Sequence, residues 1–171
     1  PDVTVVDIRG NVDTRLRRVT AAGDDRLDAV VLAYAGLVRL GRGGEVTEVL
    51  PPELMLPAPG QGALAVECRA EDERTAALLA ASDDGPTRAS VLAERALLAT
   101  LEAGCAAPVG ALAEAAAHNV DLRAVVFAPD GTASVRRTAT GPLDEPERLG
   151  RELAAELLAG GAAALMGEQE T

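Results

Sequence analysis

Residues 50–62 cannot form a regular helix or strand, because this short stretch holds four prolines and two glycines. Proline fixes φ and removes a backbone donor, while glycine is conformationally free in a way that regular elements avoid. The stretch reads LPPELMLPAPGQG and is typical of a hinge or a crossing between domains. We therefore expect the chain before it and the chain after it to belong to different parts of the fold.

The chain before this hinge alternates strand-like and helix-like segments. Residues 3–8 are a β-branched run typical of a strand, and Asn11 can cap a helix that follows it. Residues 28–33 predict a second, buried strand, and residues 35–40 predict a short helix. The order strand, helix, strand, helix is the pattern of a parallel α/β sheet.

The chain after the hinge predicts an antiparallel sheet flanked by helices. Pro129-Asp130-Gly131 separates the last two of three short strand-like segments, since proline fixes φ and glycine permits a positive φ. Such segments are expected to pair as an antiparallel meander. The expected elements are a strand at 63–68, helices at 72–81 and 87–103, strands at about 109–116, 120–128 and 133–140, and an amphipathic helix at 145–159.

Composition limits both the core and the partners. Apolar residues make up 48% of the chain, but there is one Tyr, one Phe and no Trp, so the core must be built from Leu, Val and Ala. The net charge of −11 argues against nucleic acid and anionic membranes, because both repel an acidic protein. Residues 1–56 carry a net charge of only −2, so an anion-binding surface is expected there.

Nothing in the sequence indicates secretion or membrane insertion. Two cysteines are too few for a disulfide framework, and no apolar run approaches the ~20 residues of a membrane helix. The opening PDVTVVDIRG lacks a basic n-region and a cleavage site, and it reads as a strand entered in mid-fold. We expect a soluble, cytoplasmic protein and a chain that is a piece of a longer one.

Arginines follow both predicted strands of the first part of the chain. Arg9 and Arg15 flank the start of the helix after the first strand, and Arg39 comes shortly after the second. Ligands of open α/β sheets sit at the carboxyl ends of strands, and guanidiniums there could grip carboxylates bidentately. The alternative is that these are solvated arginines, with Arg9 and Arg15 paired to Asp7 or Asp13.

The two cysteines differ in their surroundings. Cys68 lies in an apolar predicted strand and is expected to be inert core. Cys105 lies in a loop of small residues, EAGCAAP, and could be either a buried loop thiol or a reactive one. The dipole at the preceding helix C-terminus would raise the pKa of this thiol, so simple nucleophilic catalysis is not its obvious role.

Other catalytic patterns are missing from the sequence. The single histidine, His118, supports neither a catalytic triad nor a metal site, and we expect no metal. Residues 41–44 are glycine-rich but lack the Lys-Ser/Thr of a P-loop, so we interpret them as a plain turn.

Four blocks of the sequence, in matching order and spacing, resemble the porphobilinogen deaminase (hydroxymethylbilane synthase) family. Any one block is only suggestive, whereas four in register over nearly the whole chain are specific. Ala103 stands where the family usually has a second glycine before the cysteine, and Asp13 occupies a variable position. The blocks are DIRGNVDTR at 7–15, LAYAGLVRLG at 32–41, LPAPGQGALAVECR at 56–69 and LEAGCAAPVG at 101–110.

The resemblance implies an enzyme of three domains, of which this chain would be the C-terminal half. Residues 1–56 would form the latter part of the second α/β domain, which is similar to periplasmic binding proteins. Residues 57–82 would be the hinge and a segment that returns to the first domain. Residues 83–171 would form the small α+β third domain, which carries the cofactor. The N-terminal half of the same enzyme, with the family's catalytic aspartate, would be the missing partner.

The implied reaction joins four porphobilinogen molecules head to tail into hydroxymethylbilane, with release of ammonia, in porphyrin and haem (tetrapyrrole) biosynthesis. Arg9, Arg15 and Arg39 match the family's carboxylate-binding arginines and would be catalytic and cofactor-binding, while Gln61 would face the same cleft from the hinge. Cys105 matches the residue that anchors a dipyrromethane cofactor through a thioether. It need react only once with the azafulvene carbon, so a sluggish thiol suffices. The intact enzyme is expected to be a monomer.

Two other interpretations stay open at the level of sequence. A small-anion-binding domain of the periplasmic-binding-protein type would explain the α/β pattern and the arginines, but neither Cys105 nor the last part of the chain. A pink, Ehrlich-reactive chromophore on the protein would decide for the enzyme. The third interpretation is a folding piece with no activity of its own.

Overall fold

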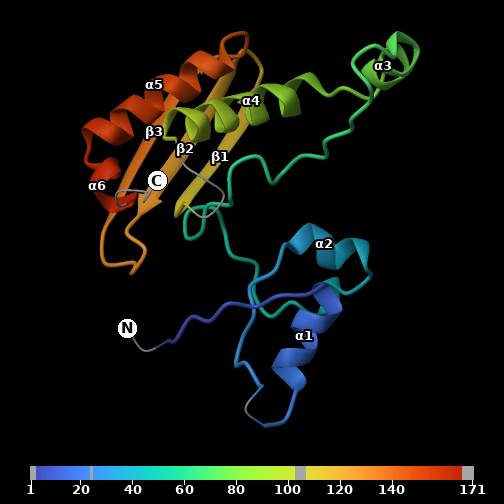
Figure 1. Ribbon diagram of the computed structural model, residues 1–171, viewed down its shortest axis with the longest axis vertical. Helices are drawn as coiled ribbons and strands as arrows, with labels where there is room; N and C mark the ends of the chain where they lie inside the picture. Colours follow the sequence, from blue (N-terminus) through green and yellow to red (C-terminus); the bar gives the residue numbers. More distant parts are fainter. Residues whose placement is uncertain (1–2, 24, 103–106, 167–171) are drawn as a thin grey trace. The chain divides into compact units, whose positions relative to one another are not determined.

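The computed structural model describes residues 3–23, 25–102 and 107–166. It divides into two compact units, Pro1–Leu50 and Pro51–Thr171, which Figure 1 colours along the sequence. The boundary lies inside the proline-rich stretch 50–62, where no helix or strand is formed, as the prolines predict. Within the described residues, none of the helices has the length and apolar character needed to cross a membrane.

The first unit has two α-helices and one 3₁₀ turn among its described residues, namely α1 (Val12–Thr20), α2 (Tyr34–Arg39) and η1 (Gly43–Glu45). Helix α1 begins where predicted, because the Asn11 side chain accepts a hydrogen bond from the Thr14 N–H at 2.9 Å. This contact satisfies one of the orphan donors of the first helical turn. The helices predicted in this part of the chain are confirmed.

The strands predicted at 3–8, 28–33 and 63–68 are wrong for the described chain, because these segments join no β-ladder. They run as extended backbone with exposed apolar side chains, such as Val5 at 91% and Leu64 at 79% exposure. A strand needs a partner for its N–H and C=O groups, and no described segment pairs with these three. The parallel sheet expected from the local pattern is therefore not formed here.

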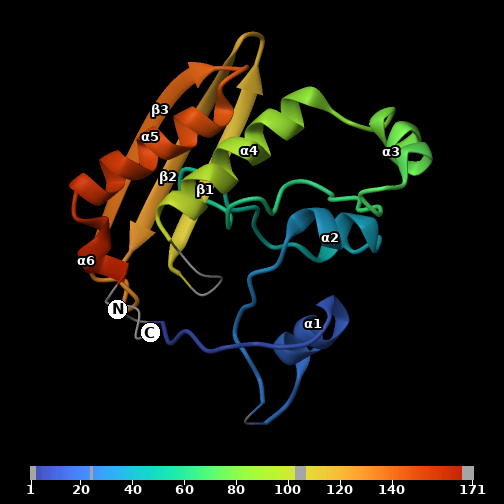
Figure 2. The same cartoon turned by 45° about the horizontal axis from the view of Figure 1, so that its top comes forward.

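The second unit is a three-stranded antiparallel sheet with helices on one face (Figures 1 and 2). The sheet has the order β1-β2-β3, as the predicted meander requires, and α4 packs beside α5. Helix α6 is an addition that the sequence pattern did not predict. The elements are α3 (Glu73–Ala80), α4 (Gly85–Thr100), β1 (Val109–Ala116), β2 (Asn119–Phe127), β3 (Ser134–Pro142), α5 (Pro146–Ala159) and α6 (Ala162–Met166).

The apolar core of this unit is built from Leu, Val and Ala among the described residues, as composition predicts. Alternate residues of β2 point at the helices, so Leu122 is fully buried against a layer that includes Leu97 and Leu153. The single phenylalanine, Phe127, is 37% exposed and contributes little to this core. Small side chains bury less area each, so the unit depends on close helix–helix and helix–sheet contact.

The proline-rich stretch packs against β1. Leu56 is buried and lies over Gly110, where an added Cβ would come within 3.0 Å of the Leu56 Cβ. The Ala111 N–H donates to the Pro57 carbonyl oxygen at 2.9 Å. The irregular backbone of this stretch therefore covers part of the sheet. Leu56 and Pro57, which lie in the expected hinge, are attached to β1 of the second unit.

The first turn of α4 gives a pH-dependent prediction. Hydrogen bonds from the Thr87 hydroxyl and N–H lower the pKa of the capping Asp84, so the cap stabilises the fold above the ordinary aspartate pKa and is lost as pH falls through the lowered value. Asparagine caps equally well without titrating. We expect Asp84→Asn to lose less thermal stability than wild type between about pH 5 and pH 3. Melting curves by circular dichroism test this, and an identical acid loss in both proteins would contradict it.

Candidate functional site

The three predicted arginines all lie in the first unit. Arg9 immediately precedes the turn into α1, Arg15 lies on α1, and Arg39 is the last residue of α2. The Arg15 Nε donates to the Gly10 carbonyl oxygen at 2.9 Å, which holds its guanidinium next to the start of the helix. Its two terminal nitrogens form no hydrogen bond with any other residue that the structure describes. Arg15 therefore keeps a bidentate face available for an anion.

Gly10 makes this helix start possible. Its φ is +108°, and an added Cβ would lie 2.9 Å from the Thr14 side chain. Only glycine adopts this conformation without strain, so the turn at Gly10 brings Arg9 and the Asn11 cap to the same helix end. Helix N-termini carry a partial positive charge, which adds to that of the guanidiniums. The arrangement suits a carboxylate.

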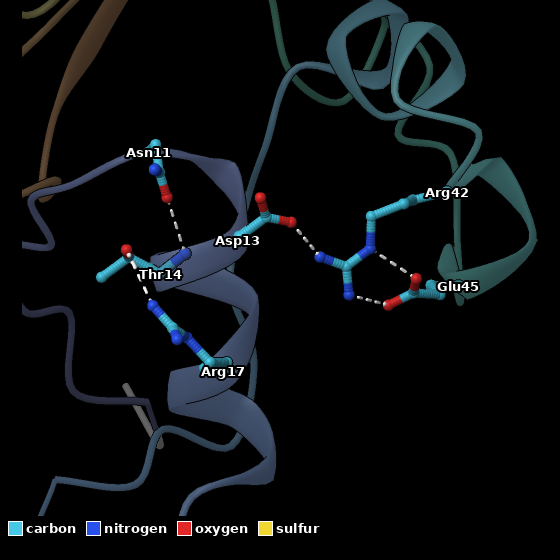
Figure 3. Close-up of polar contacts among 6 residues, drawn as sticks. All are labelled: Asn11, Asp13, Thr14, Arg17, Arg42 and Glu45. Carbon is cyan, nitrogen blue, oxygen red and sulfur yellow. Dashed lines mark hydrogen bonds and ion pairs between the residues drawn. The ribbon is translucent and has the colours of Figure 1, made fainter.

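A cluster of one arginine and two carboxylates, which was not predicted from the sequence, joins α1 to η1 (Figure 3). The Arg42 guanidinium is bidentate to Glu45, at 2.5 and 2.6 Å, and its remaining nitrogen donates to Asp13 Oδ1 at 2.5 Å. These bonds raise the pKa of Arg42, and the hydrogen bond from Arg42 lowers that of Glu45. In the sequence, the three-residue spacing of Arg42 and Glu45 indicates that these two side chains can pair. No local pattern indicates the bond to Asp13, which is 29 residues away.

The ion pair of Arg42 with Asp13 tests the alternative in which Arg9 or Arg15 pairs with Asp7 or Asp13. Asp13 accepts from Arg42, and within the described residues neither Arg9 nor Arg15 forms an ion pair with an aspartate. Arg42 also follows Arg39 by three residues, so it ties the end of α2 to the start of α1. The contact is an exposed ion pair that links the start of α1 to the residues that follow α2. The structure gives no direct contact between the three predicted site arginines.

Gln61 lies in the second unit, on a tight turn of the proline-rich stretch. Its N–H donates to the Ala58 carbonyl oxygen at 3.3 Å, and its side chain is exposed. The neighbouring Gly60 N–H donates to Glu94 Oε2 at 2.6 Å. Glu94 is on α4 and is 5% exposed, and burial raises the pKa of its carboxyl although two backbone N–H groups donate to it. A glutamate on the apolar side of a predicted helix was the sequence signal for this residue.

Of the two cysteines, the described residues include Cys68. Cys105 lies outside the described residues, so its predicted role stays a prediction. Cys68 is exposed, and the expectation that it belongs to the core is wrong because residues 63–68 do not enter a sheet. The exposed thiol makes Cys68 a real competitor for any reagent that attacks cysteine.

An apolar cavity of about 330 Å³ lies against the start of β1 and the residues just before it. It is lined by residues 54–56, 107–110 and Phe127, and no charged side chain is among them. A ligand with several carboxylates would find no partner there. Within the part of the chain that the structure describes, no group of three or more His, Cys, Asp and Glu side chains could hold a metal ion.

Comparisons with known proteins cover nearly the whole chain. Residues 1–77 match the family model described as porphobilinogen deaminase, dipyromethane cofactor binding domain, and residues 89–159 match porphobilinogen deaminase, C-terminal domain. The chain is 55% identical to porphobilinogen deaminase 1 of Streptomyces avermitilis, over 98% of this chain and 54% of the relative. It is 56% identical to the porphobilinogen deaminase of Mycobacterium avium, over 93% of this chain and 52% of the relative. The chain therefore spans about half the length of the curated relatives it matches.

Proposed function

The chain belongs to the porphobilinogen deaminase family, and we propose that it supplies about half of a hydroxymethylbilane synthase. That enzyme would condense four porphobilinogen molecules head to tail and release one ammonia for each pyrrole unit that is added. The observation that carries the proposal is the 55% identity over 98% of this chain to a porphobilinogen deaminase. The arginines at the start of α1 support it, because the substrate of such an enzyme carries carboxylates.

Arg9, Arg15 and Arg39 would bind the acetate and propionate groups of substrate and cofactor. Three guanidiniums in one unit suit a ligand with several carboxylates, since each can donate two parallel hydrogen bonds. The bond from Arg15 Nε to Gly10 would keep the fork oriented before the ligand arrives. When bound, the dipyrromethane cofactor would supply the primer to which pyrrole units are added. Cys105 would hold it through a thioether, and Gln61 would contact it from the hinge.

The domain assignment follows from the same proposal. Residues 1–56 would complete a domain similar to periplasmic binding proteins, residues 57–82 would be hinge and returning segment, and residues 83–171 would be the third domain. The exposed apolar segments 3–8, 28–33 and 63–68 support this, because each would find strand partners in the other half of the enzyme. The net charge of −11 argues against binding to nucleic acid or to anionic membranes. The intact enzyme would be a monomer in the cytoplasm.

Activity tests this proposal directly. Turnover of porphobilinogen is expected when this chain is combined with the N-terminal half of the same enzyme, and not with this chain alone, because the acid–base aspartate would lie in the other half. Turnover by the isolated chain would overturn this placement of the catalytic machinery. A complex that binds small anions but stays colourless and Ehrlich-negative would favour the anion-binding alternative.

A substitution of Arg15 tests most directly whether the arginines bind the carboxylates of substrate and cofactor. Arg15→Lys keeps the charge but loses the fork and the bond to Gly10, and one charge-assisted hydrogen bond is worth about 1.5–3 kcal/mol. We therefore expect kcat/KM of the combined enzyme to fall roughly 10- to 150-fold. Arg17→Lys is the matched control, since Arg17 lies on the same helix and its side chain hydrogen-bonds only to Thr14 among the described residues. Near wild-type turnover in the lysine variants of Arg9, Arg15 and Arg39 alike would refute the proposal.

A further inference from the structure

We propose that Glu94 is a positioning residue for Gln61, because its buried carboxylate ties the turn that carries Gln61 to the edge of the β-sheet. The functional part of this inference rests on the proposed role of Gln61. The structural part concerns only contacts inside the second unit.

Glu94 uses both carboxylate oxygens on backbone donors from two different segments. Oε1 accepts from the Ala113 N–H of β1 at 2.7 Å, and Oε2 accepts from the Gly60 N–H at 2.6 Å. These donors lie 19 and 34 residues away along the chain. The side chain is therefore a bridge between α4, β1 and the proline-rich turn.

The bridge covers part of one free edge of the sheet, that of β1. Strand β1 pairs with β2 on one side only, so alternate N–H groups on its other side lack a strand partner. Ala111 donates to the Pro57 carbonyl oxygen at 2.9 Å, and Ala113, two residues on, donates to Glu94. An unpaired edge invites association with other chains, so covering it has a value of its own. The turn at 57–61 is held at both ends by this cover.

The role of Glu94 is to tie two segments together, which differs from the role of an apolar core residue. Burying a charge is costly, and a well-packed apolar side chain in its place is often neutral or stabilising. Glu94 is almost fully buried without any basic partner among the described residues, and its two hydrogen bonds go to backbone N–H groups. The residue therefore contributes the tie between segments, which an apolar side chain could not provide.

Gln61 is the last residue before a stretch of the second unit that forms no backbone hydrogen bonds with other described residues. Its own N–H closes the turn on Ala58, and Gly60 adopts a φ of +73° to make that turn. Residues 62–68 form no backbone hydrogen bond with another residue in the described part of the chain. Glu94 thus anchors the point from which the extended segment leaves, and it sets where Gln61 stands.

Amide hydrogen exchange on the 171-residue chain tests the tie without any activity. The Gly60 amide is expected to be protected relative to the Gly62 amide, for which the described residues offer no acceptor. Glu94→Gln keeps the size but replaces one acceptor by a donor, so exchange at Gly60 or Ala113 should rise about tenfold or more. Glu114→Gln, an exposed carboxylate beside Ala113, is the matched control and should change neither amide. An unprotected Gly60 amide in the wild-type chain would overturn the tie and requires no variant.

A double-mutant cycle in the combined enzyme tests the action through Gln61. Glu94→Gln and Gln61→Ala should each lower kcat/KM, and the effect of Glu94→Gln should shrink at least severalfold when Gln61 is already alanine. Glu114→Gln should leave kcat/KM unchanged. Full additivity of the two variants would overturn the positioning role, since a merely structural loss adds. An inactive wild-type complex would instead count against the proposed function, while the exchange result would still decide the tie.

Discussion

Gly150→Ala is expected to destabilise the second unit by about 3 kcal/mol, because the added methyl group has no room between two helices. Its carbon would overlap the Ala93 carbonyl oxygen and lie within 2.9 Å of Ala96 Cβ and the Leu97 nitrogen. Two of these three atoms are backbone and cannot rotate away, so α4 and α5 must separate. The gain in helix propensity from glycine to alanine, about 1 kcal/mol, is too small to compensate.

Thermal unfolding monitored by circular dichroism measures this loss. A shift of the thermal midpoint by more than about 10 °C is expected for a domain of this size. Gly36→Ala is the control, since Gly36 is also helical and an added Cβ there meets nothing within 4 Å. It should be neutral or slightly stabilising. An unchanged midpoint for Gly150→Ala would show that the two helices do not cross in close contact at this residue.

Cys105→Ser is expected to leave the combined enzyme with no covalently attached pyrrole, and therefore with no turnover. A hydroxyl is a much poorer nucleophile than a soft thiol near neutral pH, so it would not form the bond that anchors the cofactor. Folding should be nearly unaffected, because serine is close in size to cysteine. Intact mass and peptide mapping after incubation with porphobilinogen provide the measurement.

Cys68→Ser is the matched control for this prediction. Cys68 is an exposed thiol, so exposure alone would favour it as the site of attachment. The variant should keep both the adduct and the activity, because the family resemblance assigns the cofactor to the loop around Cys105. An adduct mapped to Cys68 in the wild-type protein would overturn the assignment.

The helices and the meander could be predicted because their signals are local. Asn11 caps a helix through a residue three positions later, and the Pro129-Asp130-Gly131 turn lies between strands that pair directly. A helix satisfies most of its backbone hydrogen bonds within its own segment, so a short pattern suffices to define it. The four motif blocks were also readable without coordinates, and the comparisons confirm the family that they indicate.

Other features depended on residues far apart in the chain. Residues 3–8 have the composition of a strand, but a strand exists only with a partner, and the described residues provide none. Residues 63–68 also lack a strand partner among the described residues, and Cys68 is therefore exposed.

The contacts around the candidate site were decided by tertiary structure as well. Asp13 and Arg42 are 29 residues apart, and Glu94 and Gly60 are 34 apart, so no local pattern announces either bond. Sequence alone determined the helices other than α6, the meander and the family, because those signals lie within short segments. Only the folded chain determined that the Glu94 carboxylate binds the turn at 57–61. A buried carboxylate accepts hydrogen bonds from whichever backbone N–H groups the packing brings within reach.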